Sequence, residues 1–174
     1  MPITPLHLGP GLVLKGLVDA RLSLVVFAFA QLVLDVEVIL RLLLGAEPLH
    51  GWTNTLAGAS LALVPTVLLG KPLGELVLRR WNAGLPPTLR CRLGTPTTIG
   101  WRAAAWGGAL GVYSHWLLDA FMHVDALALW PLLPGNPLAA WFSIDAVNGA
   151  CALTFVVGAA LFAGRRRRRA SRAL

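Results

Sequence analysis

Four long apolar stretches, separated by polar segments, run through the chain. They cover residues 22–44, 56–70, 99–118 and 146–164. An α-helix rises 1.5 Å per residue, so about 20 apolar residues cross the hydrocarbon core of a bilayer. The second stretch is shorter, but it reaches across if residues 53–55 are included and Pro65 is tolerated within the helix. The pattern predicts four membrane-spanning helices.

A fifth apolar stretch lies near the N-terminus. It covers residues 6–18 and contains two polar residues, His7 and Lys15. A helix of this length is about 20 Å long, which is short for a crossing, so it is tilted, re-entrant, thin-spanning or interfacial. We expect it to turn back at residues 19–21 into the first span. The expected fold class is an all-α integral membrane bundle, with four transmembrane helices plus one short N-terminal helix in a single domain, 1–174.

The basic residues indicate which side of the membrane each loop occupies. Five consecutive arginines, Arg165 to Arg169, follow the last apolar stretch, and such clusters mark the cytoplasmic side. If the basic tail 164–174 is inside, the arginines of 79–102 are also inside, whereas segments 45–54 and 123–141, without Lys or Arg, are outside. We predict a multi-pass protein of the plasma (inner) membrane with a cytoplasmic C-terminus and the lipid bilayer as its partner.

The composition agrees with a membrane protein. Hydrophobic residues make up 56% of the 174 residues and charged residues 13%, compared with about 25% charged in soluble domains. A net charge of +7 could indicate nucleic-acid binding, but the basic residues lie in blocks beside apolar stretches. We therefore expect no nucleic-acid partner. Cys91 and Cys151 suggest no disulfide framework, and the first residues do not resemble a cleaved signal peptide.

Histidines and carboxylates gather towards the predicted outer side. Ionisable groups at the centre of a span cost about 2.5–3.5 kcal/mol each, so such residues are usually functional. His115, Asp119 and His123 stand at i, i+4 and i+8 and therefore share one side of a helix. Upstream on that side are small residues that allow close helix packing: Ala104, Gly108 and Gly111. The row is predicted to face the bundle interior.

Further polar residues mark the outer ends of the first two spans. Asp35 and Glu37 are two residues apart, so they cannot point the same way on a helix. One can face the site while the other pairs with Arg41, which is at i+4 from Glu37. His50 and Asn54 are again at i and i+4, at the outer mouth of the second span.

Imidazole and carboxylate groups without a nearby thiolate suit a divalent metal, with zinc first and manganese or iron as alternatives. Two or three histidines with one or two carboxylates leave a coordination position for a water, which the metal acidifies towards neutral pH. A spare carboxylate can then carry the proton. These features predict metal-dependent hydrolysis. The position near the membrane surface suggests a phospholipid or another amphiphilic ester or phosphoester as the substrate.

Four segments along the chain stand out: TPLHLGPG, DVE, HGWTNTL and SHWLLDAFMH. They resemble, in order, the N-terminal histidine, the D-x-D-like acidic pair, the H-R-G-x-T-H-S-like segment and the H-x-x-x-D helix of the YdjM-like family. Members of that family are bacterial membrane-bound metal-dependent hydrolases. The resemblance implies a set of metal-site residues: His7, Asp35, Glu37, His50, His115 and Asp119.

The third segment departs from the family pattern in two ways. Asn54 stands where a second histidine is expected, and the arginine after His50 is absent. Loss of an imidazole would weaken or delete one metal position, and His123 could replace it. Asn54 and His123 are therefore candidates at the edge of the site, and with Asp35 and Glu37 they are the candidate catalytic residues.

Other interpretations of the same residues stay open. The His/Asp cluster could join helices in a non-catalytic membrane subunit or scaffold, an alternative that Asn54 favours. Haem ligation by two histidines is disfavoured because so many carboxylates lie nearby. Glu47 and Asp125 fit solvated loop charges, and Asp145 fits the first turn of the last span. The Pro-rich segment 130–142 fits the headgroup layer and could cover the site as a lid.

Overall fold

The chain folds into helices joined by loops, which confirms the all-α class. The computed structural model describes residues 5–18, 21–139 and 141–171, and these contain no strand. The elements in chain order are η1 (Pro5–His7), α1 (Leu8–Val18), α2 (Leu24–Leu43), η3 (Trp52–Asn54), α3 (Leu56–Gly84), α4 (Pro87–Leu93), α5 (Trp101–Met122) and α6 (Ile144–Ser171).

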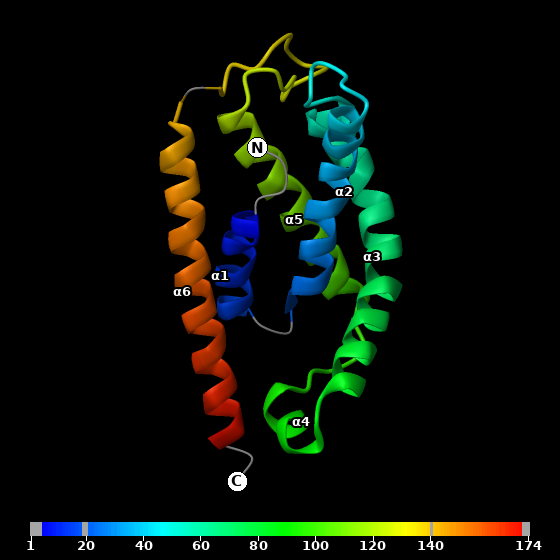
Figure 1. Cartoon of the computed structure of the whole chain (residues 1–174), viewed down its shortest axis with the longest axis vertical. Helices are drawn as coiled ribbons and strands as arrows, with labels where there is room; N and C mark the ends of the chain where they lie inside the picture. Colours follow the sequence, from blue (N-terminus) through cyan, green and yellow to red (C-terminus); the bar gives the residue numbers. More distant parts are fainter. Residues whose placement is uncertain (1–4, 19–20, 140, 172–174) are drawn as a thin grey trace.

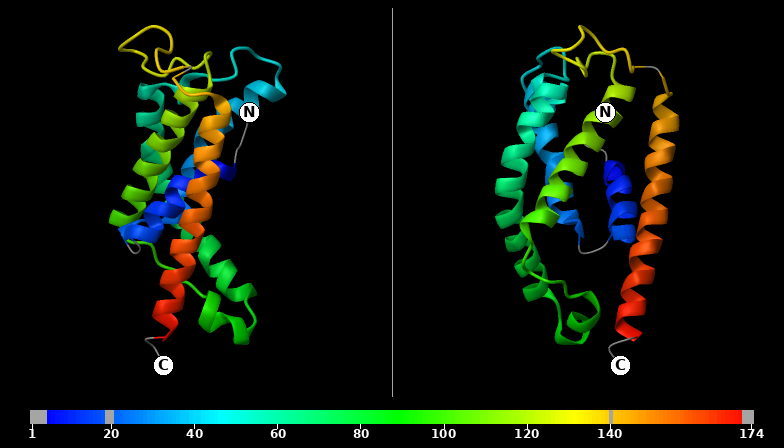
Figure 2. Two further views of the ribbon diagram at one scale, coloured as in Figure 1. Left: turned by 90° about the vertical axis from the view of Figure 1, so that its left-hand side faces the viewer. Right: turned by 180° about the vertical axis from the view of Figure 1, so that it is seen from behind.

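The long helices run along the same axis, and successive ones point in opposite directions (Figures 1 and 2). Helices α2, α3 and α5 pack against one another, and the short α1 lies between this group and α6. The loops after α2 and α5 meet at one end of the bundle. Helix α4 and the end of α6 lie at the other (Figure 1). The described parts of segments 45–54 and 123–141 thus lie at one end of the bundle, and α4 with the end of α6 at the other (Figure 1).

Within the part of the chain that the structure describes, two helices are long and apolar enough to cross a membrane, α3 and the Ile144–Arg165 part of α6, not the four that the sequence pattern predicts. Helix α2 is long enough, but it carries three charged residues, Asp35, Glu37 and Arg41. Helix α5 is rich in Gly and Ala and contains His115 and Asp119. Because of these charged and polar residues, α2 and α5 are less apolar than α3 and α6. Helix α3 continues through Pro65 and Pro72 to Gly84, well beyond the predicted end at residue 70.

Side-chain caps fix where α2 and α3 begin. The hydroxyl of Ser23 accepts a hydrogen bond from the backbone N–H of Val26 at 3.3 Å, and that of Thr55 accepts one from Gly58 at 2.9 Å. Such caps replace the helical acceptors that the first turn lacks and stabilise a helix by about 1 kcal/mol. Because α3 starts immediately after Thr55, the preceding Asn54 is held at the mouth of the bundle.

Close packing of α5 against α2 depends on a small residue. A Cβ on Gly111 would lie 2.9 Å from the backbone oxygen of Phe27 and 2.6 Å from the Cβ of Ala30, so only glycine fits. Gly111 is one turn before His115 on the same face, and both are buried. The prediction that His115 and Asp119 face the bundle interior is confirmed, whereas His123, the third residue of the predicted row, lies just past the end of α5 and is half-buried.

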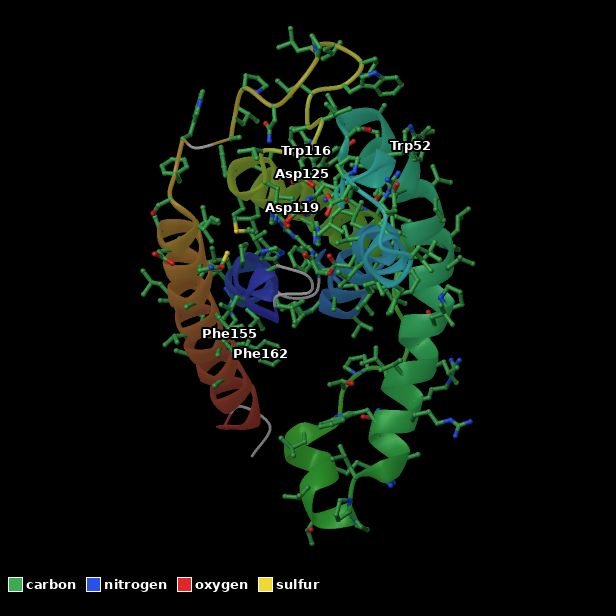
Figure 3. The ribbon with its side chains drawn as sticks, turned by 45° about the horizontal axis from the view of Figure 1, so that its top comes forward. Trp52, Trp116, Asp119, Asp125, Phe155 and Phe162 are labelled. Carbon is green, nitrogen blue, oxygen red and sulfur yellow. The ribbon has the colours of Figure 1, made fainter. Side chains whose placement is uncertain are left out.

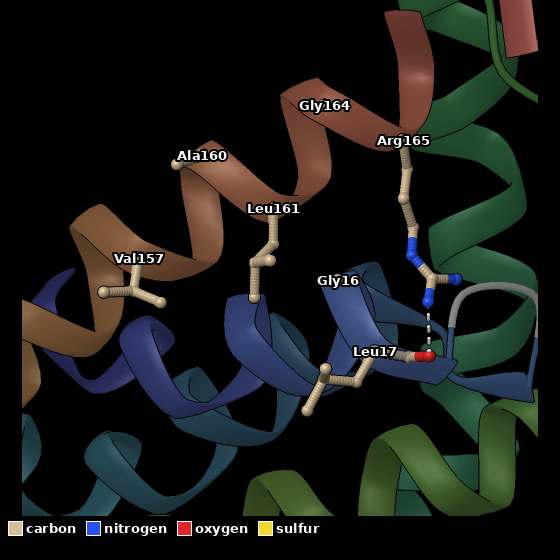
Figure 4. Close-up of a pocket in the computed structure, with 7 residues that line it drawn as sticks. All are labelled: Gly16, Leu17, Val157, Ala160, Leu161, Gly164 and Arg165. Carbon is tan, nitrogen blue, oxygen red and sulfur yellow. Dashed lines mark hydrogen bonds between the residues drawn. The ribbon is translucent and has the colours of Figure 1, made fainter. Parts of the chain in front are cut away.

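The short helix α1 packs against α6. Gly9 and Gly158 each face backbone of the opposite helix, so the two helices approach closely at these two positions. At the far end, Nη2 of Arg165 donates a hydrogen bond of 2.8 Å to the backbone oxygen of Leu17 (Figure 4). Eleven residues give α1 a length of about 16 Å. It is antiparallel to α2 (Figure 1), as expected, although residues 19–20 of the predicted turn lie outside the described part of the chain.

Candidate metal centre

Polar side chains from three separate elements meet inside the loop-covered end of the bundle. His7 comes from η1, Asp35 from α2, and His115 and Asp119 from α5. All four are buried, and His115 is only 1% exposed. Asp119 lies beneath the loop that follows α5 (Figure 3). Imidazoles and carboxylates so far from solvent need partners, because burial of an unpaired polar or charged group is costly.

The distances between these groups match those between ligands of one ion. His7, His115 and Asp119 each offer an atom within 4.8 Å of the other two. Nε2 of His115 lies 3.0 Å from Oδ2 of Asp119 and 3.5 Å from Oδ1 of Asp35. Metal–ligand bonds of about 2.1 Å place two ligand atoms about 3.0 Å apart at a right angle and about 3.4 Å apart in a tetrahedron. The atoms are therefore spaced for a common cation.

Gln31 of α2 fixes the tautomer of His115. Its Nε2 donates hydrogen bonds to the backbone oxygens of Phe27 at 3.3 Å and Gly111 at 3.1 Å, so its amide oxygen must face His115. That oxygen lies 2.9 Å from Nδ1 of His115 and can only accept. Nδ1 therefore carries the proton, and the lone pair of the neutral imidazole is on Nε2, the atom next to Asp119 and Asp35. Histidines that bind metals commonly have such an outer partner.

Two buried imidazole nitrogens in this region have no hydrogen-bond partner among the described residues, Nε2 of His7 and Nε2 of His123. Nε2 of His115 is buried as well and lies 3.0 Å from the Asp119 carboxylate. The rings of His7 and His115 are perpendicular, with centroids 5.2 Å apart, so the two imidazoles are in direct contact. Buried polar groups without partners are rare in native proteins, and an ion is one of the few explanations. The donor set thus fits a divalent cation.

A second group of residues adjoins the first. His50, His123 and Asp125 also offer ligand atoms within 4.8 Å of one another. The backbone N–H of His50 donates to Oδ2 of Asp125 at 3.1 Å, and its Nδ1 lies 3.0 and 2.9 Å from the two carboxylate oxygens. Partial burial would raise the pKa of the Asp125 carboxyl, but these hydrogen bonds outweigh it and hold that pKa below its usual range. Because an ionised carboxylate only accepts, Nδ1 of His50 is the donor.

Asn54 contacts the first group through an amide. Its Nδ2 donates to Oδ2 of Asp119 at 2.5 Å, and the residue is 1% exposed. The sequence places Asn54 at the edge of the site as a candidate catalytic residue. The structure places its amide against Oδ2 of Asp119, the oxygen that also faces His115, so Asn54 helps to hold that carboxylate. A histidine expected at this position is thus replaced by a residue that still binds the site.

Glu37 lies outside both groups. Its two oxygens accept from the backbone N–H groups of Trp52 at 3.0 Å and Thr53 at 2.7 Å. It also forms an ion pair with Arg41 at 2.9 Å, as the i+4 spacing predicts. Asp35, two residues earlier, turns inward to His115 instead. Of the two acids, the structure brings only Asp35 to the candidate centre, and Glu37 holds the η3 loop.

Sequence reasoning misses Gln31 and the role of Asp125. Gln31 is one turn before Asp35 in an otherwise apolar stretch, and that isolated polar residue is a usable signal. The sequence suggests a solvated loop charge for Asp125, but this residue pairs with His50, which is 75 residues away in the sequence. The loop after α5 folds back over α3, where Ala128 accepts a 2.7 Å hydrogen bond from the N–H of Leu56. This fold-back brings Asp125 to His50.

No family model matches the chain, and neither a curated protein nor a solved structure matches it.

Proposed function

We propose that the protein is a membrane-embedded, metal-dependent hydrolase. The observation that carries the proposal is the convergence of His7, His115 and Asp119, whose ligand atoms lie within 4.8 Å of one another. Nε2 of His7 is buried there without a hydrogen-bond partner among the described residues. Zinc is the first candidate, and manganese or iron the alternatives, because the donors are imidazole and carboxylate. The YdjM-like resemblance of the motifs that contain these residues supports the same reaction class.

Each residue of the site has a proposed task. A divalent cation at this position would acidify a bound water and polarise a substrate oxygen. His7, His115 and Asp119 hold it. Asp35 is 3.5 Å from His115 and is the carboxylate placed to receive a proton during hydrolysis. The outer residues Gln31 and Asn54 keep His115 and Asp119 in position through the hydrogen bonds described above.

The outer surface of the bundle supports an integral membrane location. Large apolar side chains that are exposed on α2, α3 and α6 include Leu32, Val36, Leu40, Leu61, Leu68 and Val156. Exposed apolar surface of this extent is unusual in a soluble monomer. Asp35 points inward, so the lipid-facing side of α2 stays apolar despite its charges. We propose that α2 and α5 cross the membrane together with α3 and α6.

The charge pattern supports one orientation. The basic loop 79–102 and the basic tail lie at one end of the bundle and the candidate centre at the other (Figure 1). By the positive-inside rule the basic end is cytoplasmic, and the centre lies just below the outer surface of the plasma (inner) membrane. A phospholipid or another amphiphilic ester or phosphoester can reach a site at that depth from the bilayer.

Metal analysis tests the proposal. The protein is purified in detergent without chelators, and bound metals are measured with a His115→Ala variant beside it. Wild type should retain at least about one equivalent of zinc, manganese or iron, and His115→Ala should lose most of it with unchanged helical circular dichroism. Less than about a tenth of an equivalent in wild type, even after incubation with each metal, contradicts the proposal.

A hydrolysis assay tests the reaction class. Vesicles containing fluorogenic phospholipids or amphiphilic esters are incubated with the metal-loaded protein, with chelator-treated protein and with the Asp35→Asn variant. Only the loaded wild type should release product at an appreciable rate. Retained metal without turnover on any of these substrates would leave metal binding intact and reject the lipid hydrolase.

A non-catalytic scaffold is the second candidate. The hydrogen bond from Asn54 to Asp119 favours it, because an amide at the expected histidine position joins the η3 loop to α5 without adding a ligand. On this view, His115→Ala lowers the yield of folded protein and there is no metal to lose. Wild-type yield with loss of bound metal would reject the scaffold.

A further inference from the structure

We infer that His50, His123 and Asp125 form a second cation site beside the first, and that Asp119 bridges the two ions. The inference rests on the proposed metal centre and extends it from one ion to two. The second group satisfies the same spacing as the first, with ligand atoms within 4.8 Å of one another. Its residues come from the loop before η3 and from the loop that follows α5, so it closes the centre from the outer side.

The contact between His50 and Asp125 has the dimensions of two adjacent ligands. Nδ1 of His50 is 2.9 and 3.0 Å from the carboxylate oxygens, close to the about 3.0 Å expected between ligands at a right angle on one ion. In the absence of a metal a proton occupies this gap. A cation would replace that proton, and the backbone N–H of His50 would still donate to Oδ2 of Asp125.

His123 supplies the unsatisfied donor atom of the second group. Its Nε2 is buried without a hydrogen-bond partner among the described residues. Its ring stacks on that of His50 with centroids 3.8 Å apart and planes 23° from parallel. Two nearly parallel rings cannot direct both lone pairs at one ion, so one ring must turn when the ion binds. His123 is the one that can turn, because Asp125 anchors His50 through both its ring and its backbone.

The Asp119 carboxylate lies between the two groups. Its Oδ2 is 3.0 Å from Nε2 of His115, and its Oδ1 is 4.0 Å from Nε2 of His123. The second distance is too long for a hydrogen bond but is within reach of two metal–ligand bonds of about 2.1 Å meeting at a wide angle. A carboxylate that presents one oxygen to each group can bridge two ions. Paired ions in hydrolytic enzymes are about 3.5–4 Å apart.

The donors of the second group are again imidazole and carboxylate, so it takes the same class of cation as the first. His50 is buried, but His123 and Asp125 are only half-buried, unlike the three buried ligands of the first group. We therefore expect the second ion to bind more weakly and to be lost first on dialysis. A paired centre suits displacement at a phosphoester, because one ion can hold the attacking oxygen and the other the leaving oxygen.

Metal titration of the intact protein in detergent tests the inference. Metal-free wild type is titrated with Zn²⁺ and, separately, with Co²⁺, and equivalents are counted by elemental analysis and by the Co²⁺ absorption spectrum. Wild type should bind two equivalents. His123→Ala and Asp125→Asn should each bind one, with at least a tenfold loss of affinity for the second. Asp145→Asn, an exposed acid at the same end of the bundle, is the matched control and should bind two.

A spectroscopic measurement on wild type makes the test independent of mutant folding. Two Mn²⁺ ions joined by a carboxylate should give a spin-coupled electron paramagnetic resonance signal, whereas isolated ions give the uncoupled pattern. One equivalent that is lost in His7→Ala but retained in His123→Ala overturns the second site and leaves the proposed function standing. Two equivalents that both persist in Asp125→Asn and His123→Ala also overturn it. Binding of no metal by wild type overturns both proposals.

Discussion

The amide oxygen of Gln31 lies 2.9 Å from Nδ1 of His115 and joins α2 to α5 at the base of the candidate metal centre. The two residues are 84 positions apart in the sequence. Because the NH₂ group of Gln31 is committed to the backbone oxygens of Phe27 and Gly111, the amide cannot flip without losing both bonds. Gln31 thus sets the direction in which His115 offers its lone pair, although it does not touch the proposed ion.

This relationship predicts a selective effect on metal affinity. Gln31→Leu removes the acceptor for Nδ1 of His115, and metal affinity should fall by about 10- to 100-fold, as for other outer-residue changes in metal sites. Gln31→Glu keeps an acceptor and should retain more affinity than Gln31→Leu. Both are measured by competition with a chromogenic chelator in detergent. Equal affinity of Gln31→Leu and wild type would show that Gln31 has no role in orienting the imidazole.

Asn54 should contribute to stability through Asp119. Asn54→Ala leaves a buried carboxylate oxygen without its donor, and the metal-free protein should lose about 1–3 kcal/mol in its free energy of unfolding. Asn54→Asp places a second carboxylate against Asp119 and should be worse in metal-free protein, with stability partly restored by Zn²⁺. Thermal unfolding in detergent gives both values. Failure of Zn²⁺ to improve Asn54→Asp would argue that no cation lies next to this pair.

Glu37 should behave as a structural residue. Glu37→Gln removes the charge that accepts from Trp52, Thr53 and Arg41, and the free energy of unfolding should fall by about 1–3 kcal/mol. Metal stoichiometry should not change, because Glu37 lies outside both groups. Glu47→Gln, in the following loop, serves as the control. Loss of bound metal in a folded Glu37→Gln variant would make Glu37 a candidate ligand again.

Packing of α5 on α2 should depend on Gly111. Gly111→Ala forces a methyl group against Phe27 and Ala30 and should destabilise the protein by about 1–3 kcal/mol, as overpacking of a tight core does. Gly149 is a helical glycine at which a Cβ would meet no atom within 4 Å, so Gly149→Ala should be neutral or stabilising by up to about 1 kcal/mol. The two variants are compared by thermal unfolding. Equal melting temperatures of the two variants would show that α5 and α2 can move apart to accommodate the methyl group without loss of stability.

Orientation can be measured with fusions. A green fluorescent protein joined after residue 174 should fluoresce and an alkaline phosphatase there should be inactive, because the basic tail is predicted to be cytoplasmic. A phosphatase joined after Gly135, in the loop beyond α5, should be active. The reverse pattern would place the candidate centre on the cytoplasmic side and contradict the proposed access from the outer surface.

The helical fold and part of the site are accessible from the sequence because their signals are local. His115 and Asp119 are one turn apart on one helix, and the spacing alone puts them on the same face. The Glu37–Arg41 pair is equally local. The small residues upstream on the same face indicate that His115 faces a neighbouring helix, and His115 is indeed buried.

The other parts of the candidate site depend on contacts between segments that are far apart in the sequence. No local pattern reveals that Gln31 faces His115, that Asn54 faces Asp119, or that the loop after α5 returns to His50. The division between Asp35 and Glu37 is set by the η3 loop, which presents its N–H groups to one acid only. The lengths of the apolar stretches predict four spans, but only α3 and α6 of the described helices are apolar enough by composition. The difference comes from the charged and polar residues of α2 and α5.

Helix α1 positions His7, yet its main packing partner is the last helix of the chain. Gly9 faces the backbone at Cys151, and Leu17 receives the hydrogen bond from Arg165. During synthesis, the first helix therefore leaves the ribosome long before the surface that holds it exists. His7 can be fixed beside His115 only when α6 has been made and inserted. A nascent chain should thus be unable to retain the proposed ion until translation has finished.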